Sequence, residues 1–403
     1  MRSSNKAIVI IGGLFFVFGF VTWLGSVLIP YFKIACQLNN LESYLVAFSF
    51  YISYLVMAIP SAWVLRRTGY KKGMSLGLLI MASGALLFVP AAFLRSYLLF
   101  LTGLFVQGTG LAILQTASNP YITILGPLES AARRISIMGI CNGLAGVMAP
   151  LILGAVTLRN ADAIKAQILT LSPLEKAGIL NQLAHRVIMP YGLMALVLAG
   201  LSVLIFFSGL PELDADAEDE SVTSANTGKT SILHFPHLLL GVLTLFLYVG
   251  VEVIAGDTII PYGASQGIPL ATAKFFTSCT LTCMLAGYVI GIICIPKYIS
   301  QVSVLKLSSV MGLLFAFAAL ATKGILSVSF IALLGLANSL VWPSIWPLAI
   351  GGLGRFTKTG SSLLIMAVGG GAFLPLLYGW FADKFTPQHA YWIVVPCYLC
   401  IYY

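Results

Sequence analysis

The phrase Gly146-Val-Met-Ala-Pro150-Leu151-Ile-Leu-Gly154 decides the fold of this chain, because it returns 225 residues later as Gly371-Ala-Phe-Leu-Pro375-Leu376-Leu-Tyr-Gly379. Two shorter phrases also return in the same order. They are Ile29-Pro30-Tyr31, matched by Ile260-Pro261-Tyr262, and the segment with Pro120, Gly126 and Arg133, matched by Pro343, Gly351 and Arg355. A tandem repeat of strongly apolar units of about 200 residues is typical of membrane transporters in which two related helical bundles hold the substrate between them.

The composition indicates a polytopic membrane protein. The chain is 59% hydrophobic and only 9% charged, with a mean hydropathy of +0.98, whereas a soluble domain carries about 25% charged residues. The net charge of +9 does not indicate nucleic-acid binding, because the basic residues lie in short loops rather than in one patch. We therefore expect a protein embedded in the lipid bilayer. We also expect it to be a monomer.

Each crossing needs about 20 apolar residues, and the sequence predicts an all-α protein with about twelve crossings in two six-helix bundles related by a pseudo-two-fold axis. The predicted spans are 7–31, 43–65, 74–93, 97–125, 135–157, 188–209, 237–262, 273–295, 303–321, 326–352, 361–382 and 390–403. The first is expected to be a retained span rather than a cleaved signal peptide. The last is short, so either the natural chain continues past Tyr403 or this helix is incomplete.

These spans predict an N-terminal bundle over 1–210, an acidic cytoplasmic linker over 211–234 and a C-terminal bundle over 235–403. A helical pattern over 161–169 and 173–183 predicts an extramembrane hairpin in the first bundle.

The short loops predict that both termini are cytoplasmic, since lysine and arginine gather on the cytoplasmic side. Twelve basic residues lie on the side of the N-terminus and five on the other. The twelve are Arg2, Lys6, Arg66, Arg67, Lys71, Lys72, Arg133, Arg134, Lys297, Lys306, Arg355 and Lys358; the five are Lys33, Arg95, Lys274, Lys323 and Lys384.

Two carboxylates, Glu252 and Asp257, lie within a predicted span. A charge at the bilayer centre costs about 2.5–3.5 kcal/mol even on the lenient insertion scale, so such groups face the protein interior or a wet cavity. They are candidates for holding a coupling proton or cation; the alternative is a structural, hydrogen-bonded role. The repeat places Ser26 opposite Asp257, so the polar face of the span 7–31 is Thr22 and Ser26, with Trp23 beside them.

A set of amides and indoles on other spans suits a neutral sugar. Its members are Gln115, Asn119, Asn142, Asn338, Trp342 and Trp346. Amides pair with hydroxyl groups, and the C–H face of a pyranose packs on an indole. The alternative is that the amides join helices to one another. The sequence shows no nucleophile–base pair, metal cluster or phosphate loop, so we expect neither a cofactor nor enzymatic activity.

Three phrases resemble the fucose/glucose–galactose permease family of the major facilitator superfamily, and the resemblance covers nearly the whole chain. They are Phe18-Gly-Phe-Val-Thr-Trp-Leu-Gly-Ser-Val-Leu-Ile-Pro30, Gln115-Thr-Ala-Ser-Asn119-Pro120-Tyr-Ile-Thr-Ile-Leu-Gly-Pro127 and Tyr248-Val-Gly-Val-Glu252. The resemblance implies a twelve-helix major facilitator fold in the bacterial inner membrane. It also implies sugar import by alternating access, commonly coupled to the entry of H⁺ or Na⁺.

The chain departs from this pattern at three places. Proton-coupled members carry an Asp where this chain has Ser26, a Glu where it has Gln115, and a Gly-Arg pair where it has Gly287-Tyr288, whereas Asn142 and Glu252 match. The basic loop with Arg66, Arg67, Lys71 and Lys72 resembles the gating loop of the superfamily but lacks its Asp.

The leading hypothesis is uptake of a glucose- or galactose-type hexose or an N-acetylhexosamine by cation-coupled symport. The neutral Ser26 and Gln115 leave an uncoupled facilitator as an alternative. Efflux of an amphipathic drug is disfavoured because the candidate cavity residues are amides. A sensor or scaffold is disfavoured because the linker offers only about twenty residues and no signalling domain.

Overall fold

The structure is a computed structural model that describes residues 2–124, 131–210, 231–295, 298–350, 353 and 357–403. Gly126, Gly351 and Arg355 of the third repeat phrase lie outside these ranges, as does the linker up to residue 230. The side chains of Arg66 and Asn119 are also outside the described part, although both residues lie within helices.

Helices account for almost all of the described residues, and 11 of them are long and apolar enough to cross a membrane. The first half comprises α1 (Arg2–Thr22), α2 (Gly25–Ala35), α3 (Asn40–Leu86), α4 (Phe88–Leu94), α5 (Tyr97–Ile124), α6 (Ala131–Thr157), α7 (Ala161–Gln167), α8 (Pro173–His185) and α9 (Ile188–Phe207). The second half comprises η2 (Ile232–His234), α11 (Pro236–Asp257), α12 (Ile259–Ser265), α13 (Leu270–Ala273), α14 (Phe276–Cys294), α15 (Gln301–Ala321), α16 (Gly324–Asn338), α17 (Val341–Ile350), α18 (Thr357–Met366), η4 (Ala367–Gly369), α19 (Gly370–Lys384), η5 (His389–Ile393) and α20 (Val394–Tyr402).

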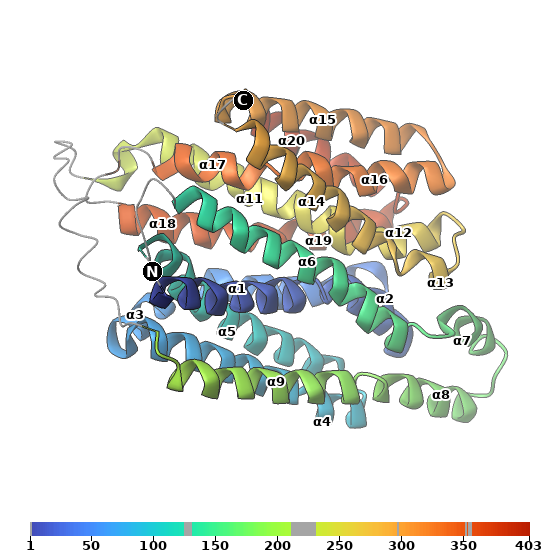
Figure 1. The fold of residues 1–403 in the computed structure, drawn as a ribbon. Helices are drawn as coiled ribbons and strands as arrows, with labels where there is room; N and C mark the ends of the chain where they lie inside the picture. Colours follow the sequence, from blue (N-terminus) through green and yellow to red (C-terminus); the bar gives the residue numbers. More distant parts are fainter. Residues whose placement is uncertain (1, 125–130, 211–230, 296–297, 351–352, 354–356) are drawn as a thin grey trace.

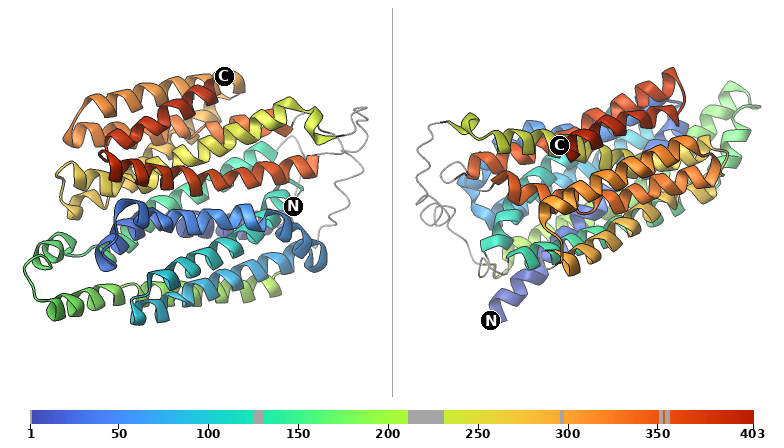
Figure 2. Two further views of the ribbon diagram at one scale, coloured as in Figure 1. Left: turned by 180° about the vertical axis from the view of Figure 1, so that it is seen from behind. Right: turned by 90° about the horizontal axis from the view of Figure 1, so that it is seen from above.

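The predicted spans are confirmed to within a few residues at most edges, and the last is a shorter apolar helix over His389–Tyr402. The predicted helical hairpin is present as α7 and α8. One difference is that α8 runs almost straight into α9, as Figure 1 shows, because Arg186 and Val187 between them keep helical backbone angles. We call this end of the molecule the hairpin end; the start of α1, the end of α9 and the start of α11 lie at the opposite end (Figures 1 and 2).

The repeated glycine phrases lie where the two bundles meet. On α6, a Cβ built on Gly146 would lie 3.2 Å from Cδ1 of Leu281 in α14, and Ser278 of α14 donates a hydrogen bond of 2.8 Å to the carbonyl of Val147. On α19, a Cβ built on Gly371 would lie 2.9 Å from the ring of Tyr51 in α3. Small residues let helices approach closely in lipid, so the repeat encodes two equivalent contacts between the bundles.

The first span of each bundle is broken in its second half, and the Ile-Pro-Tyr phrases follow the breaks in α2 and α12. The Tyr31 hydroxyl donates to the carbonyls of Leu183 (2.7 Å) and Ala184 (3.0 Å) at the end of α8. The Tyr262 hydroxyl lies 2.5 Å from that of Ser327 in α16. Both half-helices are thereby fixed at the hairpin end.

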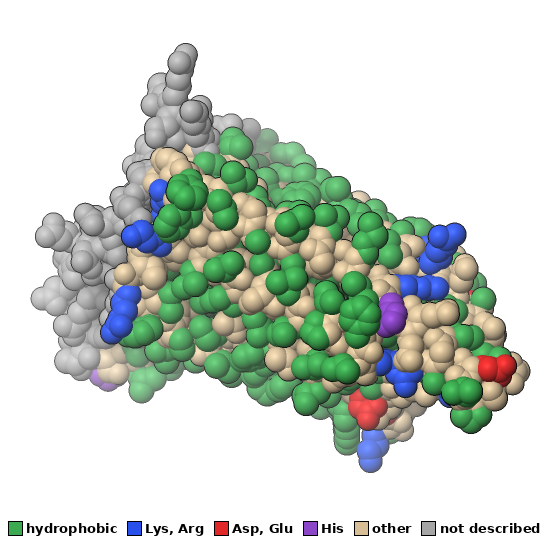
Figure 3. All heavy atoms as spheres, turned by 90° about the horizontal axis from the view of Figure 1, so that it is seen from below, with side chains coloured by type: hydrophobic (Ala, Val, Ile, Leu, Met, Phe, Trp, Pro, Cys, Tyr) green, Lys and Arg blue, Asp and Glu red, His purple; other side chains and the backbone are tan. Residues whose placement is uncertain are grey.

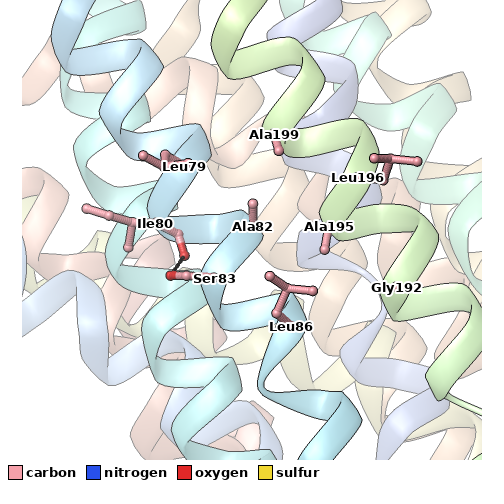
Figure 4. A pocket seen from close by; sticks show the side chains of 9 residues that line it. All are labelled: Leu79, Ile80, Ala82, Ser83, Leu86, Gly192, Ala195, Leu196 and Ala199. Atoms are coloured by element: carbon pink, nitrogen blue, oxygen red, sulfur yellow. Dashed lines mark hydrogen bonds between the residues drawn. The ribbon is translucent and has the colours of Figure 1, made fainter.

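The outer surface suits lipid. Figure 3 shows apolar side chains over the middle of one face, with lysines and arginines nearer its two ends. A groove of about 580 Å³ between α3 and α9 also faces outward, lined by Leu79, Ile80, Ala82, Ser83, Leu86, Gly192, Ala195, Leu196 and Ala199 (Figure 4). Its one hydroxyl, on Ser83, donates to the carbonyl of Ile80 at 2.7 Å. This apolar groove therefore offers a sugar no polar partner.

Candidate functional site

The second bundle contains a polar cluster centred on Glu252 of α11. The half-buried Glu252 carboxylate accepts a hydrogen bond of 2.8 Å from the Tyr248 hydroxyl, one helical turn earlier. Tyr51 of α3 lies close to Val253, the residue after Glu252, because a Cβ built on Gly371 would lie 2.9 Å from the Tyr51 ring and 3.1 Å from Cγ2 of Val253. On another side, α11 packs against α20, the helix that carries Tyr398. Because Tyr51 belongs to the first bundle, Glu252 lies close to the boundary between the bundles.

Asn338, at the end of α16, lies beside this cluster. Its Oδ1 accepts a hydrogen bond of 2.8 Å from the Tyr398 hydroxyl, while its buried Nδ2 has no hydrogen-bond partner. A buried donor without a partner costs free energy. The amide therefore offers a donor that a ligand oxygen could satisfy.

The two predicted indoles stand next to each other on α17. The rings of Trp342 and Trp346 are stacked, with centroids 5.6 Å apart and an interplanar angle of 16°. The Trp342 centroid lies 6.5 Å from that of Tyr248, the residue that donates to Glu252. The structure therefore brings the indole pair, the carboxylate and the Asn338 amide of the second bundle into one neighbourhood.

The first bundle contributes half-buried polar groups. Asn142 on α6 donates from Nδ2 to the carbonyl of Phe15 at 3.4 Å, a long hydrogen bond that leaves its Oδ1 available. Thr22 is the last residue of α1, and Gln115 lies on α5; both are half-buried. The side chain of Asn119 lies outside the described part of the chain.

Trp23 and Ser26 lie in packed protein at the break between α1 and α2. The Trp23 indole is 6% exposed and packs with Leu281 and Met284 of α14. Cβ atoms built on Gly146 and Gly256 would lie 2.6 and 2.3 Å from this ring, so the indole is held between glycines of the two bundles. The buried Ser26 hydroxyl donates to the carbonyl of Trp23 at 2.8 Å. In this conformation the Trp23 indole lies between the bundles, whereas the Ser26 hydroxyl bonds within its own bundle.

Asp257, at the end of α11, faces the same break. The residue is 1% exposed, and a Cβ built on Gly25 would lie 3.1 Å from its Oδ2. Its buried Oδ1 has no hydrogen-bond partner. An unpaired buried charge is costly, and a bound proton or cation removes that cost.

The basic loop joins the two halves of α3. Gly69, with φ of 75°, breaks the helix there in a conformation that favours glycine. The Arg67 guanidinium lies 4.2 Å from the centroid of the Trp63 ring. Lys71 is half-buried and Lys72 exposed, while the Arg66 side chain is outside the described part.

Sequence reasoning missed Tyr51 and Tyr398. A tyrosine in an apolar helix is commonly an interfacial anchor, and nothing in the local pattern separates these two from such anchors. Tyr51 lies seven residues after Tyr44, on the face of α3 that meets α19. This spacing is the one signal that could have placed Tyr51 at the bundle interface.

Comparison with known proteins agrees with this architecture. The model of the Major Facilitator Superfamily matches residues 11–374. The glucose/galactose transporter of Brucella abortus biovar 1 (strain 9-941) is 34% identical over 391 residues, which are 96% of this chain and 90% of that protein. The L-fucose-proton symporter of Escherichia coli (strain K12) is 28% identical over 387 residues, which are 95% of this chain and 88% of that protein.

Solved structures give the same result. The crystal structure of the major facilitator transporter FucP in the outward conformation superposes with a TM-score of 0.74 at 26% identity, covering 100% of this chain and 98% of that one. Sequence, helix order and superposition therefore agree: this chain belongs to the major facilitator superfamily, and its fold is the twelve-helix fold of that superfamily.

Proposed function

We propose that this protein imports a neutral monosaccharide, a glucose- or galactose-type hexose or an N-acetylhexosamine, by alternating access and in symport with H⁺ or Na⁺. The single observation that carries the proposal is the cluster in which Trp342, Asn338 and Glu252 gather beside the first bundle. Indole faces and amides suit the apolar face and the hydroxyls of a pyranose. The relatives named for glucose, galactose and fucose support this cargo.

In the proposed site, each bundle holds part of the sugar. Asn142, Gln115, Asn119 and Thr22 act from the first bundle, and Asn338, Trp342 and Trp346 from the second. Trp23 and Ser26 contribute at the break between α1 and α2, where the indole already touches both bundles. A sugar that binds residues of both bundles favours the conformation in which the two bundles enclose it.

Glu252 and Asp257 are the proposed coupling residues. Glu252 lies beside the amides and indoles, so its protonation can follow the occupancy of the sugar site. Asp257 is buried with one oxygen unpaired, and it neighbours Gly25 of the other bundle. Neutralising it with a proton or cation lowers the cost of packing the two bundles together there.

Residues 1–210 and 235–403 are the proposed moving bodies, joined by the acidic linker 211–234. The excess of basic residues at the end with the N-terminus supports a bacterial inner-membrane protein with that end in the cytoplasm. The basic loop with Arg66, Arg67, Lys71 and Lys72 is proposed to gate that side. Since one chain contains both bodies, we propose that the monomer is the transporting unit, with no cofactor and no catalytic residue.

The test is uptake of radiolabelled hexoses into proteoliposomes that contain the purified protein, with and without an imposed proton or sodium gradient. We expect saturable uptake that is inhibited by unlabelled glucose, galactose or N-acetylglucosamine. We also expect one of the two ion gradients to drive accumulation of the sugar against its own gradient. Saturable uptake whose rate and final level are unchanged by either ion gradient identifies an uncoupled facilitator. Absence of saturable uptake for every sugar of the panel contradicts sugar import.

A further inference from the structure

Two exposed carboxylates at the hairpin end bind backbone N–H groups of the opposite bundle. Asp162 of α7 accepts from the N–H of Leu270 (3.0 Å to Oδ1) and of Ala271 (3.1 Å to Oδ2). Asp383 of α19 accepts from the N–H of Asn40 (3.1 Å to Oδ1) and of Leu41 (2.7 Å to Oδ2). Each carboxylate therefore bridges the bundles with two main-chain bonds.

The two bridges occupy equivalent places in the repeat. Asp162 follows α6 and Asp383 is near the end of α19, the two helices that carry the repeated glycine phrase. Each carboxylate binds the start of the span packed against its own helix, 270–294 for α6 and α3 for α19. This pseudo-symmetry sets the contacts apart from incidental surface pairs.

The first turns of α13 and α3 have no side-chain acceptor of their own for these N–H groups. Pro269 precedes Leu270 and provides no side-chain cap. Asn39 precedes α3, but its Oδ1 accepts only from the N–H of Glu42, at 2.7 Å. The first N–H groups of a helix need an acceptor, and a negative charge is favoured there. In this structure, where the bundles are in contact at the hairpin end, that acceptor comes from the other bundle.

Asn40 extends one bridge to the half-helix α2. Its Nδ2 donates to Oδ1 of Asp383 at 2.6 Å, and its own Oδ1 accepts from the ammonium group of Lys33 in α2. The broken first span, the start of α3 and the end of α19 are thereby joined at a single point of the hairpin end.

We propose that Asp162 and Asp383 form a paired latch that holds the bundles together at the hairpin end, and that they are gating residues for alternating access. The latch deepens the proposed function and rests on it. Parting the bundles at this end breaks both sets of bonds, since donor and acceptor lie in different bodies. Water replaces the lost partners in the open state, so each bridge shifts the equilibrium only about five- to ten-fold. A latch of this strength favours closure and still permits opening.

The test is a distance measurement across the hairpin end. Spin labels are placed at Leu98→Cys in α5 and Ile325→Cys in α16, both exposed, in a background in which the seven native cysteines are replaced. Pulsed electron–electron resonance then gives the populations of short and long distances for Asp162→Asn, Asp383→Asn and the double variant. Asparagine keeps the size of the side chain but loses one acceptor and the charge. The matched control is Glu175→Gln, because Glu175 lies at the same end and bonds only within its own bundle, to Ser172.

We expect the ratio of the long-distance to the short-distance population to rise about five- to ten-fold in each single variant, further in the double variant, and by less than two-fold in the control. Distances in the double variant that match those of the parent would overturn the latch. Should an asparagine variant aggregate, the exchange of Asp for Glu at each position gives the same readout with the charge moved by one methylene. The measurement needs no sugar. A shift in distances together with absent hexose uptake by the parent therefore contradicts the proposed function and not the latch.

Discussion

At the scale of single residues, the sequence already pointed to Glu252, Asn338 and Trp342, because a carboxylate, an amide and an indole within apolar spans need polar company. The structure identifies the hydrogen-bond partners of the carboxylate and of the amide. Tyr248 donates to Glu252 and Tyr398 donates to Asn338. Tyr248 lies one helical turn before Glu252, so the helical spacing is enough to predict that contact. Tyr398 lies 60 residues from Asn338, so no local pattern predicts that pair.

Glu252→Gln tests the coupling role of the carboxylate. Glutamine keeps the acceptor for the Tyr248 hydroxyl but cannot take up a proton at neutral pH. We expect sugar accumulation against its gradient to fall at least about ten-fold, while exchange of labelled for unlabelled sugar stays within about three-fold of the parent. The measurement compares driven uptake with counterflow in the same vesicles. A variant that still concentrates sugar removes Glu252 from the coupling mechanism, and the exposed Glu175→Gln serves as the control.

Trp342→Ala tests the proposed stacking of the sugar on an indole. An aromatic contact is worth about 0.5–1.5 kcal/mol beyond its area, so we expect the KM for the sugar to rise about five- to ten-fold with a smaller change in kcat. The control is Trp392→Ala, since Trp392 is 51% exposed and packs on Phe317, with ring centroids 5.8 Å apart. Equal changes in KM for the two variants would show that Trp342 has no special contact with the sugar.

At the scale of helices, apolar periodicity predicted nearly all spans, and the repeated glycine phrases predicted two related bundles. The contacts of these phrases, of α6 with α14 and of α19 with α3, are seen only in the structure. The sequence does not predict that Asp162 and Asp383 bridge the bundles, because both look like solvent-exposed carboxylates in loops. Their partners are main-chain N–H groups of the other bundle. Every residue except proline has such a group, so the sequence of side chains does not identify these contacts.

Glycines on α1 test how closely this helix packs on α6. A Cβ built on Gly19 would lie 2.0 Å from the carbonyl oxygen of Asn142, whereas one built on Gly13 meets nothing within 4 Å. Overpacking against a backbone atom costs about 1–3 kcal/mol, so Gly19→Ala is expected to lower the melting temperature of the purified protein by several degrees. Gly13→Ala on the same helix is expected to leave it unchanged or slightly raised. Equal melting temperatures for the two variants would contradict this packing.

At the scale of the whole molecule, the proposed orientation, with both termini in the cytoplasm, predicts which residues face the outside. Single cysteines at Leu169, between α7 and α8, and at Lys72, in the basic loop, lie at opposite ends of the fold, and both are exposed. In a background without the native cysteines, an impermeant maleimide applied to intact cells is expected to label Leu169→Cys only. Labelling of Lys72→Cys in place of Leu169→Cys would reverse the orientation.

The central claim is that one sugar binds to residues of both bundles. The most direct test is the dissociation constant of the sugar, measured by titration calorimetry for the parent, Asn142→Ala and Asn338→Ala. These amides lie on α6 and α16, one in each bundle. Loss of a hydrogen bond that leaves a buried partner unsatisfied costs about 1–3 kcal/mol, so each variant is expected to bind the sugar about ten-fold or more weakly. Sugar bound as tightly by both variants as by the parent would contradict the shared site.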